Sequence, residues 1–243
     1  MEHSIISPSS YKRWSNCPAS PSLSQLAEER PMHIAAKLGT ILHDASESVL
    51  LERNESSAFL GTVHKVTGDK IIIEQEHIDT IDTYTDFIKT KKKEMKGELY
   101  LERKLELGEE IHPSLFGTAD AIVVNDKKIS VVDLKTGKWK VEPDDPQLKI
   151  YALGSLLDKD IQKELDTEIS QVETTIVQPK LKQQVSTIEH DLHALVDWGL
   201  TELKQAAERC FETDPQPVAG DWCRFCPAKE KICPLYNSGE KNE

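Results

Sequence analysis

Residues 117–138, GTADAIVVNDKKISVVDLKTGK, are the stretch that decides the fold of this chain. Apolar runs at 116–124 and 128–134 flank a short polar turn, and this pattern predicts two strands joined as a hairpin. Asp120 lies on the first strand and Asp133 ends the second, so the hairpin brings both carboxylates to one end of the sheet. Two carboxylates at that separation repel each other unless a cation lies between them, and oxygen ligands suit Mg²⁺ or Mn²⁺.

A lysine and three further residues extend this pair. Lys135 lies two residues beyond Asp133, so on an extended strand both side chains point to the same face. An ammonium there can stabilise negative charge that develops on a phosphate. An Asp-x-Lys sequence at a strand end is usually not catalytic by itself. The prediction gains weight from Gln147 and Tyr151, four apart on the helix that follows, and from His43 on an upstream helix, which offers a further metal ligand.

The remaining elements are predicted by periodicity and capping signals. We expect helices at 34–51 and 75–96, a strand at 98–107, a helix from Pro146 to about Leu157 with Asp145 as its N-cap, a strand at 172–178, and a helix at about 186–211. The apolar stripe expected on that last helix comprises Leu192, Leu195, Val196, Leu200, Leu203, Ala207 and Phe211. This order predicts an α/β fold with a mixed central sheet flanked by helices.

The length fits one domain over residues 1–243. Within it we expect an N-terminal segment (1–33), a helical part (34–97), a core (98–212) and a cysteine-rich tail (213–243). No apolar run approaches the ~18 residues of a membrane span, and the N-terminus lacks a secretory signal, so we expect a cytoplasmic protein with no membrane partner. A net charge of −12 argues against a protein that coats nucleic acid electrostatically, so any DNA contact must come from local basic patches.

The cysteines are placed unevenly. Cys17 stands alone, whereas Cys223, Cys226 and Cys233 are clustered near the C-terminus. Four thiolates suit either tetrahedral zinc or a 4Fe–4S cluster, and such a group would tie the two ends of the chain together. Cys210 falls on the apolar stripe of the last helix and is interpreted as a buried core cysteine.

The order of these residues along the chain resembles the motifs of RecB-like nucleases of the PD-(D/E)XK superfamily. The motifs are His43, then GTAD with Asp120, then VVDLKTG with Asp133 and Lys135, and then QLKIY with Gln147 and Tyr151. The resemblance runs from about residue 38 to 157. It implies a restriction-endonuclease-like core that hydrolyses DNA. Ala119 stands where the superfamily's name has a proline.

The roles of the residues follow from this resemblance alone. His43, Asp120 and Asp133 would bind Mg²⁺ or Mn²⁺, with the Leu134 carbonyl as a further ligand, and Lys135 would support hydrolysis. Gln147 and Tyr151 would orient the substrate or the other site residues.

The cysteine spacing is similar to the iron–sulfur staple of AddB-type and CRISPR-associated adaptation nucleases, which favours a 4Fe–4S cluster over zinc at Cys17, Cys223, Cys226 and Cys233. Compact nucleases of this kind are encoded by phages or mobile elements and act in replication, recombination or DNA turnover. The resemblance implies an exonuclease that processes DNA ends or strands of single-stranded character. Because the sequence has no phosphate-binding loop of the helicase type, unwinding would need a helicase or recombination partner.

Weaker features leave alternatives open. Glu102 is either a supporting acid or a solvated strand residue, and Glu47 is either a ligand or a solvated helix residue. The basic residues between Lys89 and Lys104 form either a phosphate-contacting ridge or a solvated helix end. Trp139, between two lysines, either stacks on an unpaired base or anchors its loop.

Two functions from other classes compete with a nuclease. A non-catalytic nucleic-acid-binding or scaffold protein of the same fold would suit the acidic net charge. A zinc-ribbon-like adaptor would make the cysteines the functional part.

Overall fold

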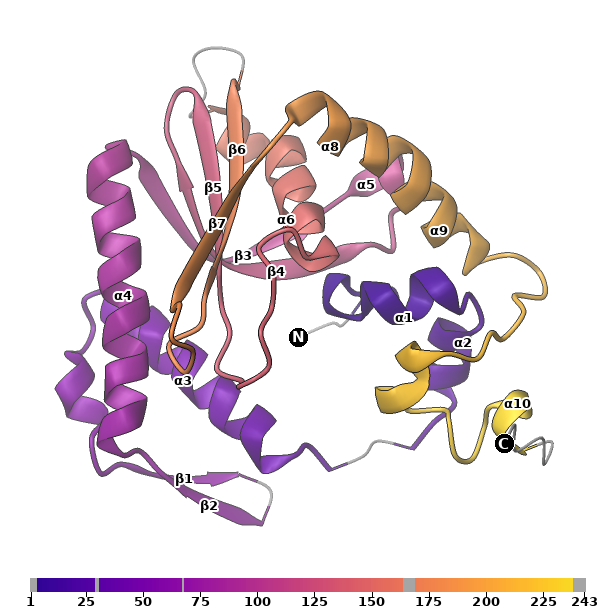
Figure 1. Ribbon diagram of the computed structural model, residues 1–243, viewed down its shortest axis with the longest axis horizontal. Helices are drawn as coiled ribbons and strands as arrows, with labels where there is room; N and C mark the ends of the chain where they lie inside the picture. The colour runs from indigo at the N-terminus through magenta and orange to yellow at the C-terminus, as the bar shows by residue number, and fades with distance from the viewer. Residues whose placement is uncertain (1–3, 29–30, 67, 164–168, 238–243) are drawn as a thin grey trace.

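A five-stranded mixed sheet forms the centre of the computed structural model, which describes residues 4–28, 31–66, 68–163 and 169–237 (Figure 1). The strand order is β3-β4-β5-β6-β7, and only the β5–β6 pair is parallel. The strands are β3 (Glu98–Glu106), β4 (Phe116–Val124), β5 (Lys128–Leu134), β6 (Gln171–Val177) and β7 (Val185–His190). Helices flank this sheet, so the predicted α/β class is confirmed.

The β4–β5 hairpin has the predicted bounds at both strands. Its register pairs Val124 with Ile129 and Ala121 with Val132. The turn is closed by the Asn125 side chain, whose Oδ1 accepts hydrogen bonds from the backbone N–H groups of Lys127 and Lys128. An asparagine commonly closes a turn in this way, because its short side chain reaches the backbone two residues on.

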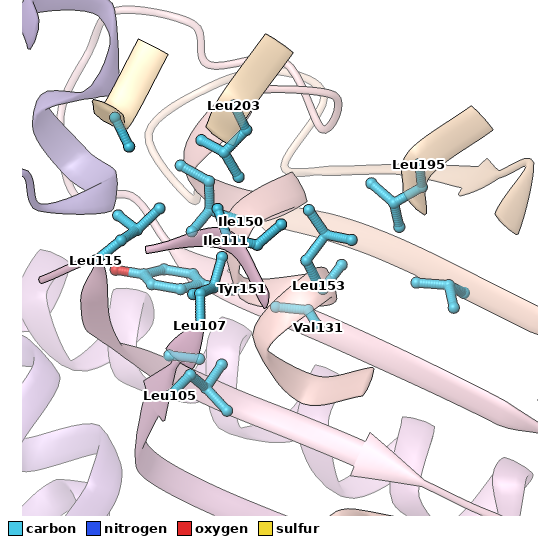
Figure 2. Close-up of a cluster of buried hydrophobic side chains, with 14 of the residues drawn as sticks. Leu105, Leu107, Ile111, Leu115, Val131, Ile150, Tyr151, Leu153, Leu195 and Leu203 are labelled. Atoms are coloured by element: carbon cyan, nitrogen blue, oxygen red, sulfur yellow. The ribbon is translucent and has the colours of Figure 1, made fainter. Parts of the chain in front are cut away.

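Helix α6 (Pro146–Leu157) makes the crossover between the parallel strands, as a parallel pair requires. The predicted cap is confirmed: Asp145 Oδ1 accepts a hydrogen bond from Gln147 N at 2.9 Å, and proline occupies the first turn. Ile150 and Leu153 of this helix belong to the largest apolar cluster, together with Leu105 and Val131 from the sheet (Figure 2).

Two long helices, α3 (Ile34–Leu50) and α4 (Gln75–Met95), pack against each other, with a short hairpin of β1 (Val63–Val66) and β2 (Asp69–Ile72) between them in the chain. The helices were predicted from their apolar spacing, whereas the hairpin was not. Ile41 and Leu42 share one apolar cluster with Ile81. Tyr84 and Ile88 lie further along α4 and belong to the apolar cluster that includes Ala121, Val132 and Leu134 of the sheet.

The N-terminal helices and the C-terminal tail lie side by side, on the side of the molecule away from α4 (Figure 1). The N-terminal elements are η1 (Pro8–Ser10), α1 (Tyr11–Asn16) and α2 (Ser20–Gln25), and the C-terminal elements are η4 (Asp221–Phe225) and α10 (Pro234–Asn237). Trp14 of α1 is 1% exposed and donates from Nε1 to Ser7 O. Lys231 pairs with Glu28 at 2.7 Å and adds a link between the C-terminal tail and the N-terminal segment.

The prediction of one helix over 186–211 is wrong in two respects: where the helix begins, and which of its apolar residues are buried. Residues 185–190 form strand β7, and the helical part runs through α8 (Leu192–Trp198), a π-helical turn (Gly199–Leu203) and α9 (Lys204–Arg209). Asp191 ends the strand and caps α8 by accepting from Ala194 N, a signal that the apolar spacing obscured. The π turn changes the helical period, and Leu200 is exposed rather than buried. Val196 and Phe211 are also exposed, while Leu195, Leu203 and Ala207 are buried as predicted.

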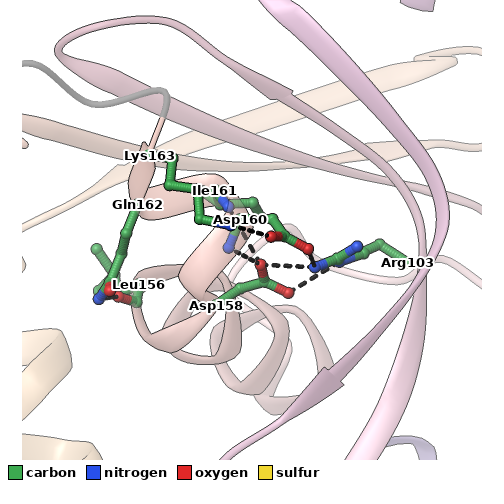
Figure 3. Close-up of polar contacts among 7 residues, drawn as sticks. All are labelled: Arg103, Leu156, Asp158, Asp160, Ile161, Gln162 and Lys163. Atoms are coloured by element: carbon green, nitrogen blue, oxygen red, sulfur yellow. Dashed lines mark hydrogen bonds and ion pairs between the residues drawn. The ribbon is translucent and has the colours of Figure 1, made fainter.

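Arg103 on β3 ties this strand to the end of α6 (Figure 3). Its guanidinium contacts both carboxylate oxygens of Asp158 at 2.8 Å and Oδ2 of Asp160 at 2.8 Å.

The remaining short elements are η2 (Ser56–Phe59), α5 (Gly108–Ile111) and α7 (Lys159–Lys163). In the part of the chain that the structure describes, no helix combines the length and the apolar character needed to cross a bilayer.

Gly154 tests how closely α6 packs on the sheet. A Cβ at this position would lie 2.9 Å from Leu105 Cβ, so Gly154→Ala should lower the free energy of unfolding by about 1–3 kcal/mol, the usual cost of overpacking. Chemical denaturation measures the change. Gly137→Ala is the control, since nothing lies within 4 Å of its Cβ position. Equal stability of the two variants would contradict the close packing.

Candidate functional site

Asp120 and Asp133 lie at one end of the β4–β5 hairpin, as the sequence predicted. Ala121, the residue after Asp120, pairs with Val132, the residue before Asp133, so the two aspartates are opposite each other on the adjacent strands. Asp120 Oδ2 accepts a hydrogen bond from Leu134 N at 2.8 Å, and its Oδ1 lies 3.4 Å from His43 Nδ1. Helix α3 therefore brings the predicted histidine to the first of the two aspartates.

Gln147 connects the second aspartate with the lysine and the tyrosine. Lys135 Nζ lies 2.8 Å from Asp133 Oδ2 and donates to Gln147 Oε1 at 3.1 Å. Gln147 Nε2 donates to Tyr151 Oη at 3.2 Å and approaches Asp133 Oδ1 at 3.5 Å. One amide, placed by the cap of α6, thus holds three of the predicted site residues in a fixed arrangement.

Glu102 joins the site, although the residue as a whole is exposed. His43, Glu102 and Asp120 each offer a ligand atom, and these atoms lie within 4.8 Å of one another. Glu102 stands opposite Asp120, where the β3–β4 register is interrupted between Leu101 and Arg103. Its φ of +44° is in the left-handed region, which costs a non-glycine residue on the order of 1–3 kcal/mol. Such strain is often found at functional sites.

The acids of this site are too close to be ionised independently. Burial raises the pKa of Asp133 to about 6, with the charge of Asp120 adding to the effect and Lys135 opposing it. Burial and the Asp120 charge raise the pKa of Glu102 to about 7. For His43, burial acts to lower the pKa, but the hydrogen bond and charge of Asp120 outweigh it and raise the pKa to about 9. A divalent cation among these ligands would relieve the same excess of negative charge.

Tyr84 is a site neighbour that the sequence did not reveal, because its spacing on α4 indicated only an inward-facing core residue. Its side chain is buried, and its hydroxyl has no hydrogen-bond partner among the described residues. Burial raises its pKa well above the ordinary value, and the charges of Asp120, Asp133 and Glu102 raise it further. A buried hydroxyl without a hydrogen-bond partner costs about 1–3 kcal/mol of stability. A polar group bound between these acids could accept a hydrogen bond from the Tyr84 hydroxyl, or donate one to it, and so remove this cost.

The basic segment from Lys89 to Lys104 does not form an unbroken ridge of free cations. Lys91 is paired with the buried Glu173 at 2.8 Å, and Arg103 is held by Asp158 and Asp160. These two sets of ion pairs join separate structural elements. Lys104 pairs with Glu106 on its own strand. Three cations of the segment are therefore used in internal ion pairs rather than left free to contact phosphates.

Trp139 does not anchor its loop. Its side chain is 85% exposed, and the loop is held instead by Gln178, a buried residue at the end of β6. Gln178 Nε2 donates to Gly137 O at 3.0 Å and to Trp139 O at 2.7 Å, while its Oε1 accepts from Val141 N at 3.2 Å. The tryptophan is therefore presented on a loop whose backbone is fixed.

The four cysteines predicted as ligands lie in one region. Val218 N donates to Cys17 Sγ at 3.4 Å. Burial raises the pKa of Cys17, and the thiols of Cys223, Cys226 and Cys233 act in the same direction. Among the described residues, His43, Glu102 and Asp120 are the only group that places three possible ligand atoms within 4.8 Å of one another, so no three of these thiols do so.

Cys210 is separate from this group in its contacts. It is buried, and its sulfur lies 3.4 Å from Ala206 O and 3.6 Å from Trp14 O. Burial raises its pKa to about 12. A protonated thiol against the N-terminal helix agrees with the predicted core cysteine.

The raised pKa values predict how the stability of the metal-free protein depends on pH. For Glu102, Asp133 and His43 the folded pKa exceeds the unfolded value, so the folded state holds more protons and the free energy of unfolding falls as the pH rises from about 4 to 9. Asp133 alone should account for on the order of 1–3 kcal/mol between pH 4 and 7. Denaturation across this range measures the slope. An equal slope in the Glu102→Gln/Asp133→Asn variant would contradict the assignment.

One comparison with known proteins bears on the whole chain. A family model described as a protein of unknown function, DUF2800, matches residues 3–240. This match covers every residue of the site and all five cysteines, and the chain therefore belongs to the DUF2800 family.

Proposed function

We propose that this protein is a Mg²⁺- or Mn²⁺-dependent DNA nuclease. The observation that carries the proposal is the arrangement at one end of the sheet, where the potential ligands His43, Glu102 and Asp120 adjoin the Asp133–Lys135 pair. The donor set is one imidazole and several carboxylates, which fits a divalent cation with a preference for oxygen. The resemblance to RecB-like nucleases supports the same conclusion.

A divalent cation held by His43, Asp120 and Asp133, with the Leu134 carbonyl, would supply Lewis-acid stabilisation of a phosphodiester. Lys135, held by Asp133 and Gln147, would place its ammonium beside the phosphate and stabilise the charge that develops on its oxygens. Glu102, with its pKa of about 7, is suited to accept a proton near neutral pH.

Gln147 and Tyr151 would act by orientation. The hydrogen bonds of Gln147 keep Lys135 and Asp133 in position, and Tyr151 is the third partner of the same amide. The substrate that we propose is DNA with ends or single-stranded character, cleaved as by an exonuclease in replication, recombination or repair. A partner protein would supply any unwinding.

We also propose that Cys17, Cys223, Cys226 and Cys233 bind a 4Fe–4S cluster. The buried sulfur of Cys17 accepts a backbone N–H, a common stabilisation of thiolate ligands, and three further thiols influence its pKa. Thiolates around a zinc ion at 2.3 Å would lie about 3.8 Å apart, whereas no three of these thiols lie within 4.8 Å of one another in the described residues. When bound, the cluster would tie the N-terminal segment to the C-terminal tail.

Cleavage of labelled linear DNA in Mn²⁺ tests the nuclease. Lys135→Ala and Asp133→Asn should each lower the rate at least 100-fold, because they remove the ammonium and a cation ligand. Lys127→Ala, on the exposed β4–β5 turn, is the matched lysine control and should retain full activity. Undiminished cleavage in both site variants, or none by the unaltered protein with any divalent metal, would overturn the proposal.

The visible spectrum of anaerobically purified protein tests the cluster. We expect a broad charge-transfer band and about four irons per chain, both lost in Cys17→Ser and both kept in Cys210→Ser. The two substitutions remove buried cysteines of the same region, so a general loss of folding would affect both. A colourless protein with stoichiometric zinc would show that the metal is zinc.

A further inference from the structure

A basic hollow lies where the N-terminal and C-terminal segments meet. It has a volume of about 690 Å³, within the range of roughly 300–1,000 Å³ that is usual for ligand sites. Side chains of η1 and α1 line one side, and η4 with the residues around it lines the other. The hollow is separate from the acidic centre at the end of the sheet.

The charge of the hollow is opposite to that of the chain. Lys12, Arg13, Arg224 and Lys229 line it, with Asp221 as its single acid, whereas the whole chain has a net charge of −12. No acidic side chain is paired with these four cations in the described part of the chain. Their charges are thus available to an anion, unlike those of Lys91 and Arg103, which are used in ion pairs.

Two aromatic side chains lie among these cations. Phe225 is 78% exposed, with the Arg224 guanidinium 5.3 Å from its ring centre. Trp222 is fixed, since its Nε1 donates to Val218 O at 2.8 Å and its ring covers Gly220 so closely that a Cβ there would overlap it. An exposed aromatic ring beside cations is the combination that binds unpaired bases together with their phosphates.

The hollow is joined to the acidic centre through η1. Ser9 and Ser10 line the hollow, and the adjacent Pro8 packs against Gly117, where a Cβ would lie 2.8 Å from the proline and 3.0 Å from the Tyr151 ring. Tyr151 is in turn bonded to Gln147 at the site. One wall of the hollow is therefore in packing contact, through η1, with a residue of the site that we propose for cleavage.

We propose that this hollow is a subsite for a single-stranded segment of DNA, with the cations on its phosphates and Phe225 and Trp222 on its unpaired bases. The inference deepens the proposed function and rests on it for the choice of DNA. An acidic peptide could use the cations but would leave the aromatic rings without a stacking partner.

Fluorescence anisotropy with a labelled single-stranded oligonucleotide, in the Lys135→Ala background without added divalent metal, tests the subsite. Lys12→Glu/Arg224→Glu should weaken binding at least tenfold and reduce the slope of log Kd against log salt, because phosphate contacts are lost. Lys127→Glu/Lys159→Glu is the control, as it makes the same change in net charge at two exposed lysines away from the hollow. Equal weakening in both double variants would overturn the proposal.

A second comparison separates stacking from charge. Phe225→Ala should weaken binding of the oligonucleotide by about five- to tenfold, the loss of one stacked base, but leave binding of an abasic strand unchanged. Thermal denaturation and the visible spectrum of each variant show whether the cysteine region is intact. Poly-glutamate that competes as well as the oligonucleotide would indicate an acidic protein partner and overturn the subsite.

The outcomes for the two proposals are distinguishable. Binding at the hollow by a protein that never cleaves DNA would overturn the nuclease and leave the subsite. Cleavage that is metal-dependent, with binding unaffected by the changes in the hollow, would overturn the subsite and leave the nuclease.

Discussion

The repulsion between Asp120 and Asp133 is the constraint on which the arrangement of the site depends. The hairpin register places both carboxylates at one end of the sheet, and Asp133 is almost completely buried. Such a pair is stable only if the surrounding structure supplies positive charge or donors. The imidazole of His43 on α3 meets this need for Asp120, as does the backbone N–H of Leu134 at the end of β5. Lys135, the next residue, meets it for Asp133.

These contacts explain why helices on both sides of the sheet are needed for one site. Helix α3 supplies the imidazole and α6 supplies Gln147, which holds the lysine against its aspartate. The compensation is incomplete, since the pKa values of Asp133 and Glu102 stay raised and the Tyr84 hydroxyl has no partner among the described residues. The divalent cation that we propose would supply the positive charge that this site lacks in the protein alone.

The sequence was most informative where one local signal determined the structure. The hairpin strands, the Asp145 cap and the helices of Ile41 and Ile81 followed from periodicity and capping, and so did the meeting of Asp120 with Asp133. It failed where a signal was overridden or came from outside the segment. The apolar residues of 186–211 fit one helix, but a cap at Asp191 and a π turn divide them. The sequence left Glu102 open between a supporting acid and a solvated residue, and it indicated Tyr84 only as a core residue. An interrupted register and the packing of α4 place these two at the site, and neither has a local pattern.

The nuclease that we propose would be an acidic protein acting on a polyanion, and such a protein needs its positive charge concentrated in one place. Ion pairs with Glu173, Asp158 and Asp160 use the cations of α4 and β3 to hold elements together. The cations beside the cysteine region have no such partners in the described residues, and they face a hollow. The same meeting of the two chain ends would therefore serve two purposes. It closes the fold around Trp14 and Cys17, and it creates a basic surface that neither end could form alone.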